Sequence, residues 1–153
     1  MIKPSLHRSD SFAQRTVEPL ALAELNRELK LNLRPAVVKL PNDTRVQIDG
    51  FDEAAKIACE IYARVGKLKG SQPDKLASDI LKLILVERHL CGKWQKIICF
   101  VDEDASKSLK NLSWLASTCD IFKIEVRVVQ ITELTRQSLL EAQSRQKMIN
   151  VAD

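Results

Sequence analysis

The sequence predicts an α/β domain with a mixed central sheet flanked by helices. Segments with the leucine spacing of amphipathic helices alternate with short runs rich in β-branched and aromatic residues. Three of these β-rich runs follow one another directly, which indicates an antiparallel meander, and later runs are separated by helical segments. A chain of 153 residues suits one domain. We expect a flexible polar arm over residues 1–16 and one α/β domain over residues 17–153.

The first predicted helix starts near Glu18 and ends before Arg34-Pro35, because a proline disfavours helical geometry in the residue before it. Its apolar stripe repeats at spacings of three and four and consists of Leu22, Leu25, Leu29 and Leu33. The three strands of the meander are expected over residues 36–40, 44–53 and 56–65.

The third of these strands alternates, so its side chains should point to two faces of the sheet in turn. One face is apolar and carries Ile57, Cys59, Ile61, Ala63 and Val65. The opposite face carries both Glu60 and Tyr62. Because carboxylates are seldom buried without a partner, Glu60 in this apolar strand indicates a functional role.

The rest of the chain alternates between helices and strands. The expected elements are a helix over residues 74–90 with Ser71 as N-cap, a strand over 94–104, a helix over 105–117 capped by Asp104, a strand over 122–131 and a helix over about 132–148. The predicted order is therefore helix, three strands, helix, strand, helix, strand, helix.

Composition and charge narrow the class of protein. No apolar run is long enough to cross a membrane and no apolar leader is recognisable, so we expect a cytoplasmic protein without a membrane partner. Four cysteines lack both C-x-x-C spacing and zinc-finger histidines, so we expect buried free thiols at Cys59, Cys91, Cys99 and Cys119. The net charge of +4 and the pI near 8.9 favour an anionic partner such as nucleic acid.

The segment Val46–Leu83 contains two acids that are eleven residues apart, Asp49 and Glu60. Asp49 ends the second expected strand, and Glu60 lies on the third. In this arrangement the sequence resembles the PD-(D/E)XK nuclease superfamily, the restriction-endonuclease-like fold, in which a helix, three strands, a helix and a strand form the core. The resemblance implies a metal-dependent nuclease-like domain in which Asp49 and Glu60 bind Mg²⁺ or Mn²⁺. It also implies a further ligand from the first helix, either Glu24 or Glu28.

The sequence departs from this superfamily two residues after Glu60, where Tyr62 stands in place of the usual lysine. A tyrosine cannot supply a positive charge at neutral pH. We therefore expect the substitute catalytic residues on the next helix, in the pattern Gln72-x-x-Lys75. Lys82 is the second choice for the lysine. Nearby, Arg64, Lys67, Lys69 and Lys82 are our candidates for contacts with nucleic-acid phosphates.

Other interpretations compete with a nuclease. Asp49-Gly50 is also typical of a hairpin or a bulge. The run Asp102-Glu103-Asp104 after a buried strand, together with the upstream Glu60, resembles the metal site of Toprim domains. In Toprim domains a glycine follows the glutamate, whereas here Ile61 follows Glu60. A non-catalytic module of the same fold that binds nucleic acid, a protein-interaction module and a homodimer are further alternatives.

Overall fold

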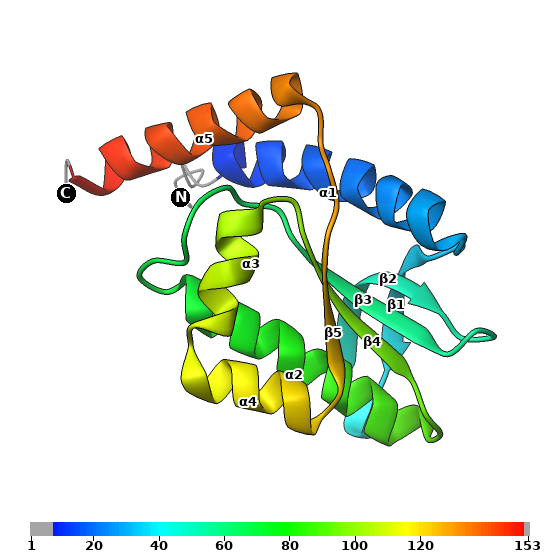
Figure 1. Ribbon diagram of the computed structural model, residues 1–153. Coiled ribbons are helices and arrows are strands. Elements are labelled where there is room, and N and C mark those ends of the chain that lie inside the picture. The colour runs from blue at the N-terminus through cyan, green and yellow to red at the C-terminus, as the bar shows by residue number, and fades with distance from the viewer. Residues whose placement is uncertain (1–7, 152–153) are drawn as a thin grey trace.

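The computed structural model describes residues 8–151, which form a five-stranded mixed sheet with helices on both faces (Figure 1). The strands lie in the sheet in chain order. They are β1 (Arg34–Lys39), β2 (Arg45–Asp52), β3 (Ile57–Tyr62), β4 (Gln95–Phe100) and β5 (Ile124–Val128). β1, β2 and β3 form an antiparallel meander, whereas β3, β4 and β5 run parallel. The predicted mixed α/β class is confirmed.

Within residues 8–151, five α-helices cover the two faces of the sheet (Figure 1). They are α1 (Arg8–Leu29), α2 (Gln72–Leu90), α3 (Glu103–Lys110), α4 (Ser113–Ile121) and α5 (Glu133–Val151), and a short 3-10 helix, Pro41–Asp43, joins β1 to β2. α1 and α5 lie side by side on one face, and α2, α3 and α4 cover the other. Each face therefore has its own apolar core.

β3 is central to both cores, because all six of its residues are buried. Its alternation matches the prediction. Ile57, Cys59 and Ile61 face the core that contains α1, whereas Ala58 and Tyr62 face the core that contains α2. Glu60 lies between the latter two in sequence and is only 2% exposed. A carboxylate therefore points into the layer between the sheet and α2.

An irregularity in β2 lies next to the predicted Asp49-Gly50 signal. Against β1, Ala36 pairs with Ile48 but Arg34 pairs with Phe51, so β2 carries one extra residue between these pairs. Gly50 also permits close packing of α1 on the sheet, since an added Cβ would lie 2.7 Å from Cδ1 of Leu22. The signal thus corresponds to a bulge in this strand.

The structure differs from the sequence prediction at three helical segments. α1 begins at Arg8, so residues 8–16 are helical and do not form the expected arm, and residues 1–7 lie outside the described part of the chain. α1 also ends at Leu29, earlier than expected, where Lys30 adopts a positive φ of 53°. The expected helix over residues 105–117 is two helices, which break around Asn111.

The cysteines are free thiols, and all except Cys91 are buried. Cys91 is exposed because it follows the last residue of α2 with a positive φ of 62°. The prediction of buried thiols is therefore wrong at this position. None of the helices in residues 8–151 has both the length and the apolar character needed to span a membrane.

Candidate functional site

Asp49 and Glu60 meet at the point where β2 and β3 separate. The two strands pair from Asp52–Ile57 to Gly50–Cys59, and their ladder ends there. Beyond it the two side chains replace ladder bonds, because the amide of Asp49 donates to Oε1 of Glu60 at 3.3 Å and the amide of Ile61 donates to Oδ2 of Asp49 at 2.9 Å. This exchange holds both carboxylates at one position between neighbouring strands.

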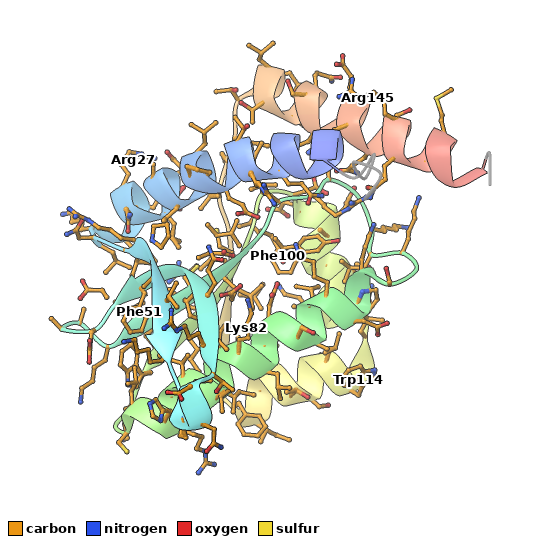
Figure 2. All side chains as sticks on the ribbon, turned by 180° about the vertical axis from the view of Figure 1, so that it is seen from behind. Arg27, Phe51, Lys82, Phe100, Trp114 and Arg145 are labelled. Atoms are coloured by element: carbon orange, nitrogen blue, oxygen red, sulfur yellow. The ribbon has the colours of Figure 1, made fainter. Side chains whose placement is uncertain are left out.

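α2 brings a third carboxylate and a lysine to the same place. Asp79 and Lys82 are three residues apart on α2, so they share one side of the helix. Lys82 is labelled in Figure 2, where it lies between α2 and the sheet. Its Nζ donates to Oε2 of Glu60 at 3.1 Å and to the carbonyl of Gln47 at 3.1 Å. The same Nζ lies 3.6 Å from Oδ1 of Asp79.

α1 adds a fourth carboxylate, Glu18. Burial raises the pKa of Glu18, and the negative charge of Asp49 raises it further, so the two carboxylates lie within electrostatic range of each other. Charges on Asp79 and Lys75 also act on Glu18. We call the four carboxylates the acidic cluster, which consists of Glu18, Asp49, Glu60 and Asp79.

Burial and the proximity of other carboxylates favour protonation within the acidic cluster. Burial raises the pKa of Glu60 from 4.5 to about 8, and the nearby charges of Asp49 and Asp79 act in the same direction. Burial likewise raises the pKa of Asp79. With a pKa of about 8, Glu60 holds a proton at neutral pH, which a bound cation can displace. The cluster is therefore a favourable environment for a cation.

The donor set fits a hard divalent cation such as Mg²⁺ or Mn²⁺, because carboxylate oxygens are the ligands that these ions prefer. Within residues 8–151, however, no group of three or more His, Cys, Asp or Glu side chains is already arranged around one metal position. The ammonium of Lys82 instead lies among the oxygens of Glu60, Asp79 and Gln47. Metal binding would require Lys82 to move toward solvent.

Tyr62 and Lys75 form a neighbouring contact. The hydroxyl of Tyr62 donates to Oε1 of Gln72 at 3.2 Å, and Nζ of Lys75 lies 5.8 Å from the centre of the tyrosine ring. Burial raises the pKa of Tyr62 to about 12, so this residue stays neutral. Gln72 and Lys75 therefore lie beside the site, but Lys82 is the lysine that contacts Glu60.

The two predicted acids of α1 do not join the acidic cluster. Glu24 accepts a hydrogen bond from Nε of Arg27 at 3.1 Å, and Glu28 is exposed. Glu18, which the sequence analysis missed, is the acid of α1 that lies near Asp49. It continues the stripe of Leu22 and Leu25 by one helical turn toward the N-terminus, and that spacing is the signal that could have identified it.

Asp102, the first acid of the Toprim-like run, is held in structural contacts. It accepts hydrogen bonds from the amide of Gly66 at 2.8 Å and from Nη1 of Arg136 at 2.6 Å. Although burial acts to raise it, these bonds lower the pKa of Asp102. The residue anchors the loop after β3 to the start of α5 and is far in sequence from the acidic cluster.

The remaining predicted site residues, Arg64, Lys67 and Lys69, follow β3 and line a separate cavity with the start of α2 and part of α5. Gln72 lines this cavity and also accepts the hydrogen bond from Tyr62, so the cavity borders the contact between Tyr62 and α2. Comparison of the chain with models of known protein families, with curated proteins and with solved structures found no significant match.

Proposed function

We propose that the acidic cluster is a divalent-metal site for hydrolysis of nucleic-acid phosphodiesters, in a domain of the PD-(D/E)XK type. The observation that carries the proposal is the exchange of hydrogen bonds between Asp49 and Glu60 at the separation of β2 and β3. A structural ion pair needs no such fixed pair of acids, and two adjacent carboxylates repel each other unless a proton or a cation intervenes.

The element order supports this fold assignment. The chain runs α1, then three antiparallel strands, then α2 and the parallel strand β4, which is the order that the resemblance to the superfamily implies. α3, α4, β5 and α5 extend this core on the C-terminal side.

Each side chain has an assigned role in the proposal. Asp49 and Glu60 hold the cation, and Glu18 assists from α1. When bound, the cation would supply positive charge to the scissile phosphate and make the attacking water more acidic. With a cation bound, Lys82 would leave Glu60 and would be the lysine that orients that water, in place of Lys75, the substitute catalytic lysine expected from the sequence. Asp79 positions Lys82 through their contact on α2.

A non-catalytic module that binds nucleic acid is the second candidate. It is favoured by one observation, the position of the Lys82 ammonium among the oxygens of Glu60, Asp79 and Gln47. In that case Lys82 would be a permanent replacement for the metal, and the cluster would only hold α2 against the sheet.

A cleavage assay separates these candidates. Single-stranded, duplex and branched DNA and RNA are incubated with the protein in Mg²⁺ or Mn²⁺, with EDTA as the metal-free comparison. The nuclease proposal expects metal-dependent cleavage that falls about 10²-fold or more in Asp49→Asn, which preserves an acceptor for the amide of Ile61. Asp120→Asn, at an exposed carboxylate of α4, should cleave like the wild type. No cleavage of any substrate would favour the non-catalytic module.

A further inference from the structure

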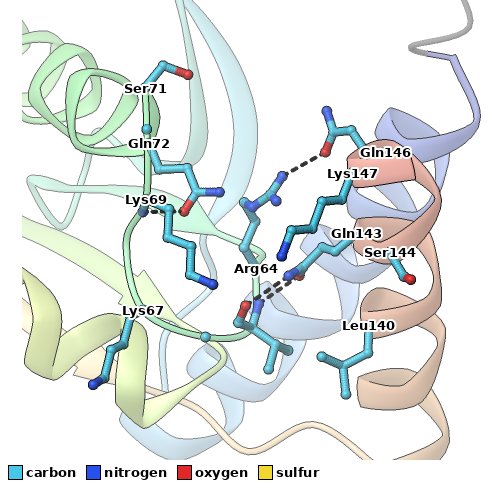
Figure 3. Close-up of a pocket in the computed structure, with 13 residues that line it drawn as sticks. Arg64, Lys67, Lys69, Ser71, Gln72, Leu140, Gln143, Ser144, Gln146 and Lys147 are labelled. Atoms are coloured by element: carbon cyan, nitrogen blue, oxygen red, sulfur yellow. Dashed lines mark hydrogen bonds between the residues drawn. The ribbon is translucent and has the colours of Figure 1, made fainter. Parts of the chain in front are cut away.

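A cavity of about 680 Å³ lies between the loop after β3 and α5. Figure 3 shows Lys69 and Gln72 on one side of this space and Gln143 and Lys147 of α5 on the other. The two sides come from parts of the chain about eighty residues apart, and hydrogen bonds join them (Figure 3). The cavity is therefore a product of the fold and not of one loop.

The cavity is strongly positive. Four cationic side chains line it, and these are Arg64, Lys67, Lys69 and Lys147. No aspartate or glutamate is among the described residues that line it, and within residues 8–151 none of the four cations has an ion pair with a carboxylate. Elsewhere Lys82, Lys96 and Arg136 all pair with acids. Four unpaired cations around one cavity favour a multiply charged anion.

The walls of the cavity are fixed. The side chain of Gln143 accepts a hydrogen bond from the amide of Val65 at 2.9 Å and donates one to the carbonyl of Val65 at 2.9 Å. Nη1 of Arg64 donates to Gln146 at 3.1 Å, while its buried Nε has no hydrogen-bond partner. Arg64 thus keeps unused hydrogen-bonding capacity at a wall that α5 holds in place.

The cavity lies at a defined separation from the acidic cluster. Gln72 at its edge and Asp79 in the cluster are about two turns apart on α2, which corresponds to about 10 Å. A nucleic-acid strand that rises about 3.4 Å per nucleotide covers this separation in about three nucleotides. One strand can therefore reach both places.

We propose that this cavity binds the terminal phosphate of a nucleic-acid strand whose body passes the acidic cluster. A terminal phosphate monoester carries a charge of about −1.5 to −2 at neutral pH, whereas an internal phosphodiester carries one negative charge, so four unpaired cations favour the end of a strand. This inference rests on the proposed function, because it takes the phosphate to be part of a nucleic acid. It adds that the protein selects strands by a phosphorylated end.

The test measures binding in EDTA, so that it does not depend on cleavage. Fluorescence anisotropy at fixed ionic strength compares one labelled oligonucleotide that carries a 5′-phosphate, a 3′-phosphate or hydroxyl groups at both ends. We expect one of the phosphorylated ends to raise affinity about 10-fold or more over the hydroxyl ends. The double substitution Lys69→Gln/Lys147→Gln should abolish this difference. Both lysines are exposed, so the variant is expected to fold.

Lys93→Gln is the matched control, because this exposed lysine follows the far end of α2 and does not line the cavity. It should retain the preference for a phosphorylated end. Equal affinity for phosphorylated and hydroxyl ends would overturn the inference, as would a preference that survives in the double variant. Competition by inorganic phosphate or adenosine monophosphate at the same concentrations as the oligonucleotide would also overturn it, in favour of a free phosphate compound.

The two proposals fail separately. Metal-dependent cleavage without any preference for a phosphorylated end would keep the nuclease-like site and remove this inference. Preference for a phosphorylated end, lost in the double variant, supports the inference even if Mn²⁺ produces no cleavage, a result that would remove the catalytic role of the acidic cluster alone.

Discussion

Glu60→Gln should change how the stability of the protein depends on pH. Burial beside Asp49 and Asp79 raises the pKa of Glu60 to about 8 in the folded state, whereas the unfolded chain releases this proton near pH 4.5. Between these values the folded state holds one more proton than the unfolded state. Raising the pH through this window therefore lowers the free energy of unfolding by about 1.4 kcal/mol per pH unit.

The glutamine side chain cannot ionise, so Glu60→Gln removes this dependence. It keeps an oxygen to accept from the amide of Asp49, and it resembles the protonated acid that the wild type contains at low pH. We expect the wild type and the variant to differ by less than about 1 kcal/mol at pH 5. Between pH 5 and pH 8 the stability of the variant relative to the wild type should rise by roughly 3–4 kcal/mol.

Urea unfolding in EDTA, followed by tryptophan fluorescence, measures these free energies at each pH. Trp94 is suited as the reporter because it is buried and stacks on Phe51, with ring centres 5.3 Å apart. Glu53→Gln is the control, since Glu53 is exposed in the turn after β2. Parallel pH profiles for the wild type and Glu60→Gln would refute the reasoning that Glu60 retains a proton.

Two further predictions concern the lysine and the tyrosine of the site. Lys82→Met should lower the free energy of unfolding by about 1–3 kcal/mol at pH 7 in EDTA, because Asp79 loses its cation and Glu60 and the carbonyl of Gln47 lose a hydrogen-bond donor. Saturating Mn²⁺ should restore stability in thermal unfolding, and a loss that Mn²⁺ leaves unchanged would contradict a metal site. Tyr62→Phe should cost about 0.5–1.5 kcal/mol through the lost bond to Gln72, without abolishing cleavage. Loss of cleavage with unchanged stability would assign Tyr62 a catalytic role.

Local patterns predicted the central part of the fold well. The alternation of β3 placed Glu60 and Tyr62 on one face because side chains in a strand alternate regardless of context. The strand order in the meander followed from short turns, which favour neighbouring strands. The start of α1 was missed because residues 8–16 have no apolar period, and the packing of α1 against α5 compensates for that.

Contacts between distant segments were beyond sequence reasoning. Glu18 comes within electrostatic range of Asp49 only in the packed fold, where α1 crosses the sheet closely at Gly50. Lys82 and not Lys75 contacts Glu60, since the direction of α2 across the sheet decides which turn of the helix lies above β3. Lys147 joins Arg64 at one cavity only after α5 folds back over the loop that follows β3.

Calorimetric titration of the protein with Mn²⁺ at pH 7 tests the central claim, that the acidic cluster binds a divalent cation. The wild type is predicted to bind about one Mn²⁺ and to release protons on binding, because Glu60 holds a proton that the metal displaces. Asp49→Asn and Glu60→Gln should each abolish saturable binding, whereas Asp120→Asn should preserve it. Absence of saturable Mn²⁺ binding by the wild type, or binding that survives unchanged in Asp49→Asn, would contradict the claim.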